Sequence, residues 1–234
     1  MKIYFACPTG QRRDMIVEKY GDTFGACLTR DIFNDITATK MSYFLDNGAF
    51  KDYKDGVENS LRNYVKLRDK FLNRLESIRT KVQKGLINMP DFVVVPDIVG
   101  NKDSYMHSRS WINLFKEDYP EFKYYLAAQN GMRIYHKQDG NSNPYCIEVG
   151  LKMSYDGLFI GGTKDWKYQT SNELIQLAKK YNKPCHIGGI GTRKSILWAK
   201  SIGADSVDSG IAMIHPVHLK EVLNIQNDLF WNIA

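Results

Sequence analysis

The chain has 234 residues, 43% of them hydrophobic, which is enough to bury a large core within one domain. No stretch approaches the roughly 18 unbroken apolar residues that a membrane-spanning helix needs, which excludes such a helix, and we expect a cytoplasmic protein. Lys and Arg outnumber Asp and Glu by 32 to 26, for a net charge of +6, which fits either a polyanionic partner or a mildly basic surface.

Strand-like and helical patterns alternate through most of the chain. The predicted elements are strands at 3–7, 23–28 (the weakest) and 43–46, a helix at 57–84, a strand at 92–96, a helix at 103–116, a strand at 124–128, a surface loop at 137–144, a strand at 157–160, a helix at 171–181, a strand at 185–187, a helix at 192–202 and a strand at 206–208. Ser171 and Thr192 are the expected N-caps of the last two helices.

The alternation and the strand composition indicate the fold class. The run Phe92-Val93-Val94-Val95 is apolar at successive positions, as expected for a strand covered on both faces of a parallel sheet. With close to eight strands and right-handed crossovers, an α/β fold of the (β/α)₈ TIM-barrel type, complete or irregular, is favoured over an open doubly wound sheet. We expect residues 1–234 to form this single domain.

Polar or glycine clusters follow six of the predicted strands. They are Asp46-Asn47-Gly48, Pro96-Asp97, Gln129-Asn130-Gly131, Gly161-Gly162, Gly188-Gly189 and Asp208-Ser209-Gly210. In a parallel barrel all of these groups meet at one rim. A rim with carboxylates, an amide and exposed glycine backbone is suited to holding a polar planar ligand and to acid, base or nucleophilic chemistry beside it.

The cysteines carry no comparable signal. Cys7, Cys27, Cys146 and Cys185 are far apart and form no Cys-x-x-Cys pair, so their spacing indicates neither a zinc knuckle nor a redox motif. We expect free thiols in a reducing compartment.

Short sequence motifs stand at the ends of several predicted strands. These are Leu45-Asp46-Asn47-Gly48-Ala49-Phe50, Val95-Pro96-Asp97, Ala128-Gln129-Asn130-Gly131, Ile160-Gly161-Gly162, and Gly189-Ile190-Gly191-Thr192 followed by a helix and Gly203-Ala204-Asp205-Ser206-Val207-Asp208. Together, from about Tyr43 to Gly210, they resemble the tRNA-guanine transglycosylase superfamily, and more closely its small phage and bacterial branch, the 7-deazaguanine DNA transglycosylases. Members of this superfamily replace a guanine base within a polynucleotide by a 7-deazaguanine.

The resemblance implies catalytic roles for two carboxylates. Asp208 would be the nucleophile that forms a glycosyl-enzyme ester, as in retaining glycoside hydrolysis. Asp46 would be the general acid for the leaving purine and then the base for the incoming one. Because the ester conserves the bond for the second base, no cofactor is implied.

The resemblance also implies a base-binding set. Asp97 would accept hydrogen bonds from guanine N1 and N2, whereas Gln129 and the N–H groups of Gly161 and Gly162 would donate to O6. Phe50 would stack on the base, and Asn47 belongs to the same strand-end motif. The methionine that forms the other side of the family's base sandwich aligns with Gly188, so Ile187 or another side chain would replace it.

The target nucleotide must leave its stack, so flanking phosphates should lie against the rim. The candidates for contacting nucleic acid are Lys164, Trp166, Lys167 and Arg193. The expected partners are DNA, or tRNA as the alternative acceptor, and a free 7-deazaguanine base. The tRNA enzymes carry a zinc subdomain after the nucleophile, but His215 and His218 have no neighbouring cysteines, so we expect no metal and favour DNA.

Other interpretations remain open on the sequence. Asp208 alone is typical of a strand-end residue that caps the following turn, and Asp46 of an Asp-Asn-Gly turn. The barrel would also suit an isomerase or lyase on a small phosphorylated metabolite, with residues 188–192 and the next helix holding the phosphate. A non-catalytic nucleic-acid-binding barrel is a further alternative.

Overall fold

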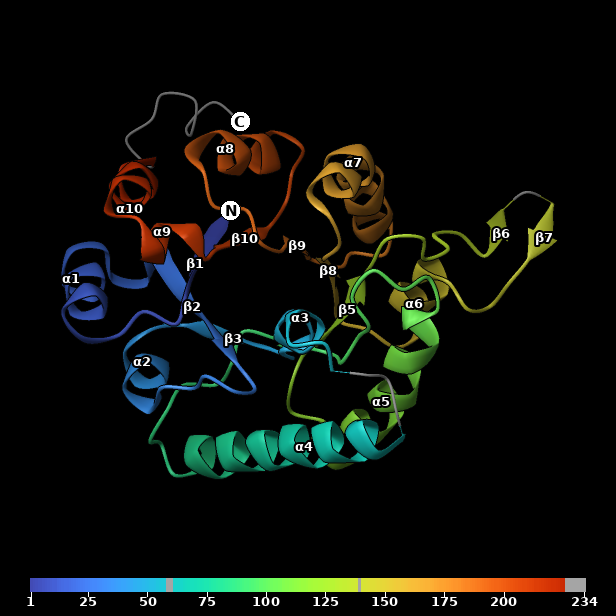
Figure 1. Cartoon of the computed structure of the whole chain (residues 1–234), viewed down its shortest axis with the longest axis horizontal. Coiled ribbons are helices and arrows are strands. Elements are labelled where there is room, and N and C mark those ends of the chain that lie inside the picture. Colours follow the sequence, from blue (N-terminus) through green and yellow to red (C-terminus); the bar gives the residue numbers. More distant parts are fainter. Residues whose placement is uncertain (58–60, 139, 226–234) are drawn as a thin grey trace.

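Eight parallel strands close into a barrel in the computed structural model, which describes residues 1–57, 61–138 and 140–225 (Figure 1). Their order around the barrel is β1-β10-β9-β8-β5-β4-β3-β2. The strands are β1 (Lys2–Ala6), β2 (Phe24–Thr29), β3 (Tyr43–Asp46), β4 (Val93–Val94), β5 (Tyr124–Ala128), β8 (Gly157–Ile160), β9 (Cys185–Ile187) and β10 (Ser206–Ser209). The predicted (β/α)₈ TIM-type barrel is therefore confirmed, and the weakest predicted strand is a full member that pairs with β1 and β3.

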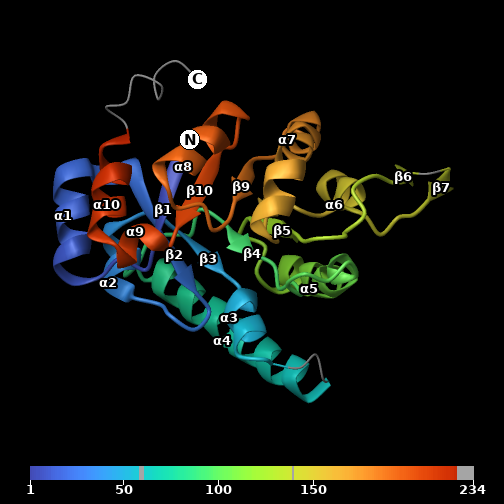
Figure 2. The ribbon, with the colours of Figure 1, turned by 45° about the horizontal axis from the view of Figure 1, so that its top comes forward.

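The helices surround the barrel, and a small hairpin projects away from it (Figures 1 and 2). The helices are α1 (Gly10–Tyr20), α2 (Asp35–Lys40), α3 (Ala49–Lys54), α4 (Leu61–Gln83), α5 (Ser104–Asp118), α6 (Ile147–Met153), α7 (Lys164–Lys180), α8 (Arg193–Ser201), α9 (Ile211–Ile214) and α10 (Pro216–Leu223), with a 3₁₀ turn at Gly21–Thr23. The hairpin, β6 (Lys137–Gln138) and β7 (Asn141–Ser142), replaces the surface loop predicted at 137–144. The helix predicted over 57–84 is observed as α4, and residues 58–60 lie outside the described part of the chain.

One predicted helix start is confirmed and one is wrong. The Thr192 side chain accepts a hydrogen bond from Ser195 N–H and caps α8. Ser171 is not a cap, because α7 already begins at Lys164, directly after the turn at Gly162 and Thr163. Ser171 instead lies within α7 and is fully buried against the core.

The inside of the barrel is filled by aromatic rings. Tyr4, Phe44, Phe92 and Tyr125 form a buried cluster, with Phe159 packed against it. The Phe92 and Tyr125 rings stack with their centroids 4.0 Å apart, and the Tyr4 ring meets the Phe44 ring edge-on at 5.0 Å. A larger apolar layer lies between the strands and the helices. These rings fill the interior of the barrel between its two ends.

Glycines on neighbouring strands make room for these rings. A Cβ atom at Gly25 would overlap the Tyr4 ring, and one at Gly157 would overlap the Tyr125 ring. A Cβ atom at Gly188 would likewise overlap Phe159. The small residues are therefore required by the packing of the barrel interior.

All eight strands run parallel, so their carboxyl ends lie at the same end of the barrel, which we call the mouth. Asp46 is the last residue of β3, Gln129 and Gly161 directly follow β5 and β8, and Asp208 lies near the end of β10. Within the described residues, no helix is long and apolar enough to cross a membrane. The four cysteines are free thiols.

Candidate active site at the carboxyl ends of the strands

Asp208 is held at the barrel mouth by two hydrogen bonds to one oxygen. Its Oδ2 lies 3.0 Å from His186 Nε2 and accepts the Gly189 N–H at 3.1 Å. The turn that follows β10 is capped instead by Ser209, whose Oγ accepts the Ala212 N–H. Asp208 is therefore not the cap of its own turn, which was one interpretation of the sequence.

His186 lies beneath Asp208, inside the barrel, and is fully buried. Its ring stacks on Phe159 with centroids 4.9 Å apart and an interplanar angle of 14°. Its Nδ1 lies 2.8 Å from Ser206 Oγ. Burial lowers the pKa of His186, although its hydrogen bond to Asp208 opposes that shift, so the neutral ring is favoured.

These contacts fix the tautomer of the ring. The Gly189 N–H already donates to Oδ2 of Asp208, so this oxygen is an acceptor and His186 Nε2 must carry the hydrogen that points to it. Nδ1 of the neutral ring then accepts from the Ser206 hydroxyl. None of the described residues donates a hydrogen bond to Oδ1, which leaves that oxygen as the one able to attack a substrate. The sequence interpretation did not include His186.

Asp46 is a half-buried carboxyl whose pKa is raised. Burial raises its pKa to about 7, with the Gly48 hydrogen bond opposing, the charges of Asp208 and Asp97 raising the pKa further, and Arg30 lowering it. Its Oδ1 accepts the Gly48 N–H at 2.7 Å, so the residue also has the turn role that its sequence suggests. A carboxyl with a pKa near neutrality can act as both an acid and a base.

The two carboxyl groups belong to one site. Their charges interact, and both also raise the pKa of the buried Cys27 thiol, for which burial is the main cause. Cys27 lies on β2, and β1 and β2 separate the strands of Asp208 and Asp46 in the closed barrel. Asp46 and Asp208 therefore lie on either side of β1 and β2, and their charges interact.

Asp97 anchors a second part of the mouth. Its Oδ1 accepts from Asn47 Nδ2 and its Oδ2 from Gln129 Nε2, both at 2.6 Å. Burial raises the pKa of Asp97 to about 6, against the effect of these two hydrogen bonds. Asn47 Nδ2 also donates to Val95 O. The amide oxygens are engaged as well, because Asn47 Oδ1 accepts the Ala49 N–H and Gln129 Oε1 accepts the Gly100 N–H. Asp97, Asn47 and Gln129 thus come together as expected, and each has a fixed orientation.

The glycine pair after β8 lies against this network. A Cβ atom at Gly161 would lie 2.6 Å from Gln129 Nε2, so a larger residue there would displace the amide. The Gly161 N–H donates to Ala128 O and is therefore not available to a ligand. For the Gly162 N–H, the described residues provide no acceptor. Gly162 has a φ of +77°, which favours glycine, and the Trp166 ring lies over it.

Lys167 lies closer to the catalytic candidates than the sequence suggested. Its Nζ donates to Gly188 O at 2.6 Å. Burial lowers the pKa of Lys167, while the charge of Asp208 raises it. The ammonium group therefore faces the inner site beside Asp208 and does not extend to the outer surface.

The remaining candidates lie further out. Lys164 and Arg193 are exposed in the first turns of α7 and α8, and Trp166 is half-buried. Phe50 is 58% exposed on α3, with Lys54 Nζ 4.8 Å from its ring centroid. Ile187 is fully buried in the layer between strands and helices, so it does not replace the methionine of the family. The space beside Gly188 is filled by Phe159.

No group of three or more His, Cys, Asp or Glu side chains is placed to hold a metal ion within residues 1–57, 61–138 and 140–225. No protein-family model matches the chain, and no curated protein matches its sequence. The resemblance to the transglycosylase superfamily therefore rests on the strand-end motifs.

Proposed function

We propose that this protein replaces guanine in DNA with a 7-deazaguanine derivative through a covalent aspartyl-glycosyl intermediate. The observation that carries the proposal is the pairing of two interacting carboxyl groups with different environments. The pKa of Asp46 is raised to about 7, and Asp208 is held by two donors on one oxygen. Two neighbouring carboxyl groups in different environments are typical of sites where one acts as acid and base and the other as nucleophile.

In the first step, Oδ1 of Asp208 attacks the anomeric carbon C1′ of the target nucleotide. The C1′–N9 bond breaks, its electron pair passes to the departing guanine, and protonated Asp46 supplies a proton to that purine. The products are an ester between Asp208 and the sugar, a free guanine and an ionised Asp46.

In the second step, ionised Asp46 takes the N9 proton of the incoming 7-deazaguanine. N9 then attacks C1′, the ester C–O bond breaks, and its electron pair returns to Asp208. Both carboxyl groups regain their initial states, so the cycle needs no oxidant, reductant or energy source. The chemistry is a transfer between two bases of similar structure.

The charge at the mouth suits a guanine-like base. Both oxygens of Asp97 accept hydrogen bonds from amide N–H groups, so Asp97 could accept from the N1–H and N2–H donors of guanine. A base at Asp97 would take the place of one or both of its present donors, Asn47 and Gln129, whose amides would then turn to the base. This exchange of partners supports a ligand that presents donors on one edge and an acceptor on the next.

The same features disfavour a phosphorylated metabolite. The N–H groups of Gly188, Gly189, Ile190 and Thr192 already donate to acceptors within the protein. The loop before α8 therefore has few amides left for a phosphate, and the Asp208 carboxyl group, which accepts the Gly189 N–H, would repel one. Base exchange in tRNA remains the alternative within the same chemistry.

An incorporation assay tests the proposal. Radiolabelled guanine is incubated with the protein and either duplex DNA, single-stranded DNA or tRNA, and label in the recovered polymer is counted. We expect label in DNA with the wild-type protein and none with Asp208→Asn, which keeps the size of the side chain. Label in tRNA alone would move the assignment to tRNA, and label in no polymer would contradict base exchange.

Nucleoside mass spectrometry after incubation with different 7-deazaguanines identifies the incoming base.

A further inference from the structure

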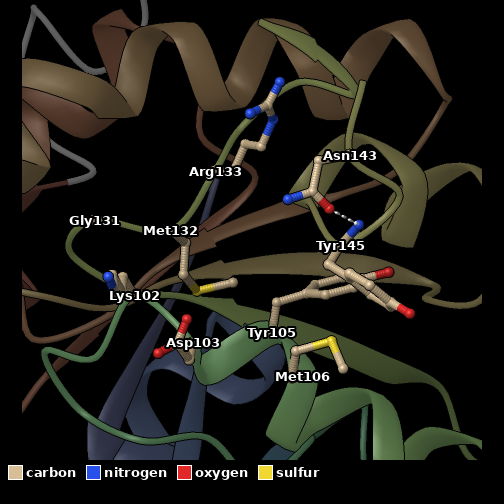
Figure 3. Close-up of a pocket in the computed structure, with 9 residues that line it drawn as sticks. All are labelled: Lys102, Asp103, Tyr105, Met106, Gly131, Met132, Arg133, Asn143 and Tyr145. Carbon is tan, nitrogen blue, oxygen red and sulfur yellow. Dashed lines mark hydrogen bonds between the residues drawn. The ribbon is translucent and has the colours of Figure 1, made fainter. Parts of the chain in front are cut away.

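A groove of ≈ 470 Å³ is lined by residues that do not belong to the candidate site (Figure 3). Its walls come from the β4–α5 segment, the β5–α6 segment and the start of α5. Lys102 follows Asp97 by five positions, and Gly131 follows Gln129 by two. The groove therefore shares two loops with the base-binding candidates and continues the barrel mouth outward.

The junction between site and groove is built around Gly131. Its φ of +78° favours glycine, and a Cβ atom there would lie 3.3 Å from Cβ of Lys102. This close approach holds the stem of Lys102 at the entrance of the groove. Lys102 is exposed, and the described part of the chain offers it neither an ion pair nor a hydrogen bond.

Aromatic and apolar surface lines the other side. Tyr145 is 42% exposed and Met106 47%, whereas Tyr105 is buried beneath them. Arg109 lies over the Tyr145 ring, with Cζ 5.2 Å from the centroid. The Tyr145 N–H donates to Asn143 Oδ1 at 2.8 Å, which fixes the backbone that carries the ring (Figure 3).

Arg133 lines the groove and donates hydrogen bonds to backbone oxygens in and before the projecting hairpin. Its guanidinium donates to Tyr135 O at 2.9 Å and to Asn141 O. These contacts fix the guanidinium at the edge of the groove, where Lys102 and Arg109 supply further positive charge. Asp103 is the acidic side chain in the lining. A groove with cationic edges and an exposed aromatic ring has the features that bind single-stranded nucleic acid.

We propose that this groove binds an unpaired nucleotide next to the target nucleotide, with its base on Tyr145 and Met106 and its phosphate near Lys102. The inference rests on the proposed function, because removing a target nucleotide from its stack also frees the neighbouring nucleotides. The ligand is a phosphodiester strand with one unstacked base, and either DNA or RNA can supply it.

Binding by fluorescence anisotropy tests the groove separately from catalysis. The probes are a fluorescein-labelled single-stranded DNA with one guanine and the RNA of the same sequence, without any free base. We expect Tyr145→Ala to weaken binding about tenfold and Tyr145→Phe, which keeps the ring, to bind nearly as the wild type. Lys102→Ala should weaken binding and reduce the salt slope by about 1, whereas the exposed Lys152→Ala, on α6 outside the groove, should change neither.

A crosslink locates the strand. With 5-iododeoxyuridine beside the guanine, irradiation should attach the oligonucleotide to the peptide that contains Tyr145. A crosslink confined to peptides outside the groove would overturn the proposal, as would equal binding by Tyr145→Ala and wild type, or no binding of either polymer by the wild type.

Failure of the groove and failure of base exchange are distinguishable. A protein that exchanges bases but binds independently of Tyr145 would overturn the groove alone. A protein that binds through Tyr145 but incorporates no labelled guanine would overturn base exchange and leave the groove in place.

Discussion

His186 Nε2 lies 3.0 Å from Asp208 Oδ2, and the ring is held from its other side by Ser206 Oγ at 2.8 Å. The pair joins neighbouring strands β9 and β10 inside the barrel. This contact decides which oxygen of Asp208 is free. Because Oδ2 takes both donors, Oδ1 is the attacking atom in the proposed reaction.

Removing the His186 donor should slow ester formation and leave DNA binding intact. His186→Phe keeps a flat ring in the aromatic interior but has no N–H for Asp208. We expect the rate of covalent adduct formation to fall by about tenfold to a hundredfold, because small displacements of a nucleophile are costly. His186→Gln, which retains an amide donor, should recover part of the rate. Single-turnover adduct kinetics and oligonucleotide affinity separate the two effects, with each variant first checked for a folded thermal transition. An unchanged rate in His186→Phe would contradict the orienting role.

The pH dependence of the two half-reactions should be opposite. Asp46 must be protonated to assist the departure of guanine and ionised to accept the proton of the incoming base. Since its pKa is raised to about 7, adduct formation should decline as the pH rises through about 7, and transfer to the second base should accelerate over the same range. Rapid-quench measurements of each step from pH 5 to 9 test this. The same slope in both steps would rule out Asp46 as the shared acid and base.

Asp46 should also affect stability in a pH-dependent way. Its folded pKa of about 7 is above the ordinary value of 3.8, so between these values the folded state binds a proton that the unfolded state releases. The stability contributed by this group is therefore fully present below about pH 3.8, is lost as the pH rises to about 7, and changes little above that. Asp46→Asn, which can still accept the Gly48 N–H, should raise the free energy of unfolding by about 4 kcal/mol at pH 8 and by less than half of that at pH 5. Urea denaturation at the two pH values gives the comparison, and equal effects at both would contradict the assigned ionisation.

The barrel interior should tolerate some glycine substitutions and not others. Gly25→Ala would place a Cβ atom within the Tyr4 ring, so we expect a loss of about 1–3 kcal/mol in the free energy of unfolding. Gly210 has a φ of −78°, and a Cβ atom added there would meet open space, with no contact within 4 Å. Gly210→Ala is therefore the matched control and should be neutral or slightly stabilising. Similar losses in both variants would contradict overlap with the Tyr4 ring as the cause of the loss.

The barrel could be predicted from the sequence because its strands are continuous apolar runs that end in polar or glycine clusters. The short helices α2 and α3 escaped prediction, since six residues give too few turns for a periodic apolar pattern. The start of α7 was missed for another reason. Residues 164–170 are mostly polar, and the apolar pattern begins only near Ser171, whose small side chain is fully buried.

The candidate site was predictable where it lies at strand ends, and not where it depends on contacts between strands. Asp46, Asp97 and Gln129 each follow an apolar run, so their convergence follows from a parallel barrel. His186 lies within the short run Cys185-His186-Ile187, where a single histidine resembles an ordinary core residue. Its role becomes visible only through the pairing of His186 with Ser206, two positions before Asp208. Side chains two residues apart on a strand point to the same face, so Ser206 and Asp208 share one face of β10. His186 can be connected with Asp208 in this way only once the strand order is known.

Trapping the covalent intermediate tests the central claim most directly. Wild-type protein is incubated with labelled DNA in the absence of an incoming base and examined on a denaturing gel, with hydroxylamine used to cleave any ester. Asp208→Asn is compared with Asp205→Asn, which makes the same chemical change three residues away and keeps an acceptor for the Cys185 N–H. The proposal predicts a hydroxylamine-sensitive adduct in the wild type and in Asp205→Asn and none in Asp208→Asn. An adduct that persists in Asp208→Asn would contradict it.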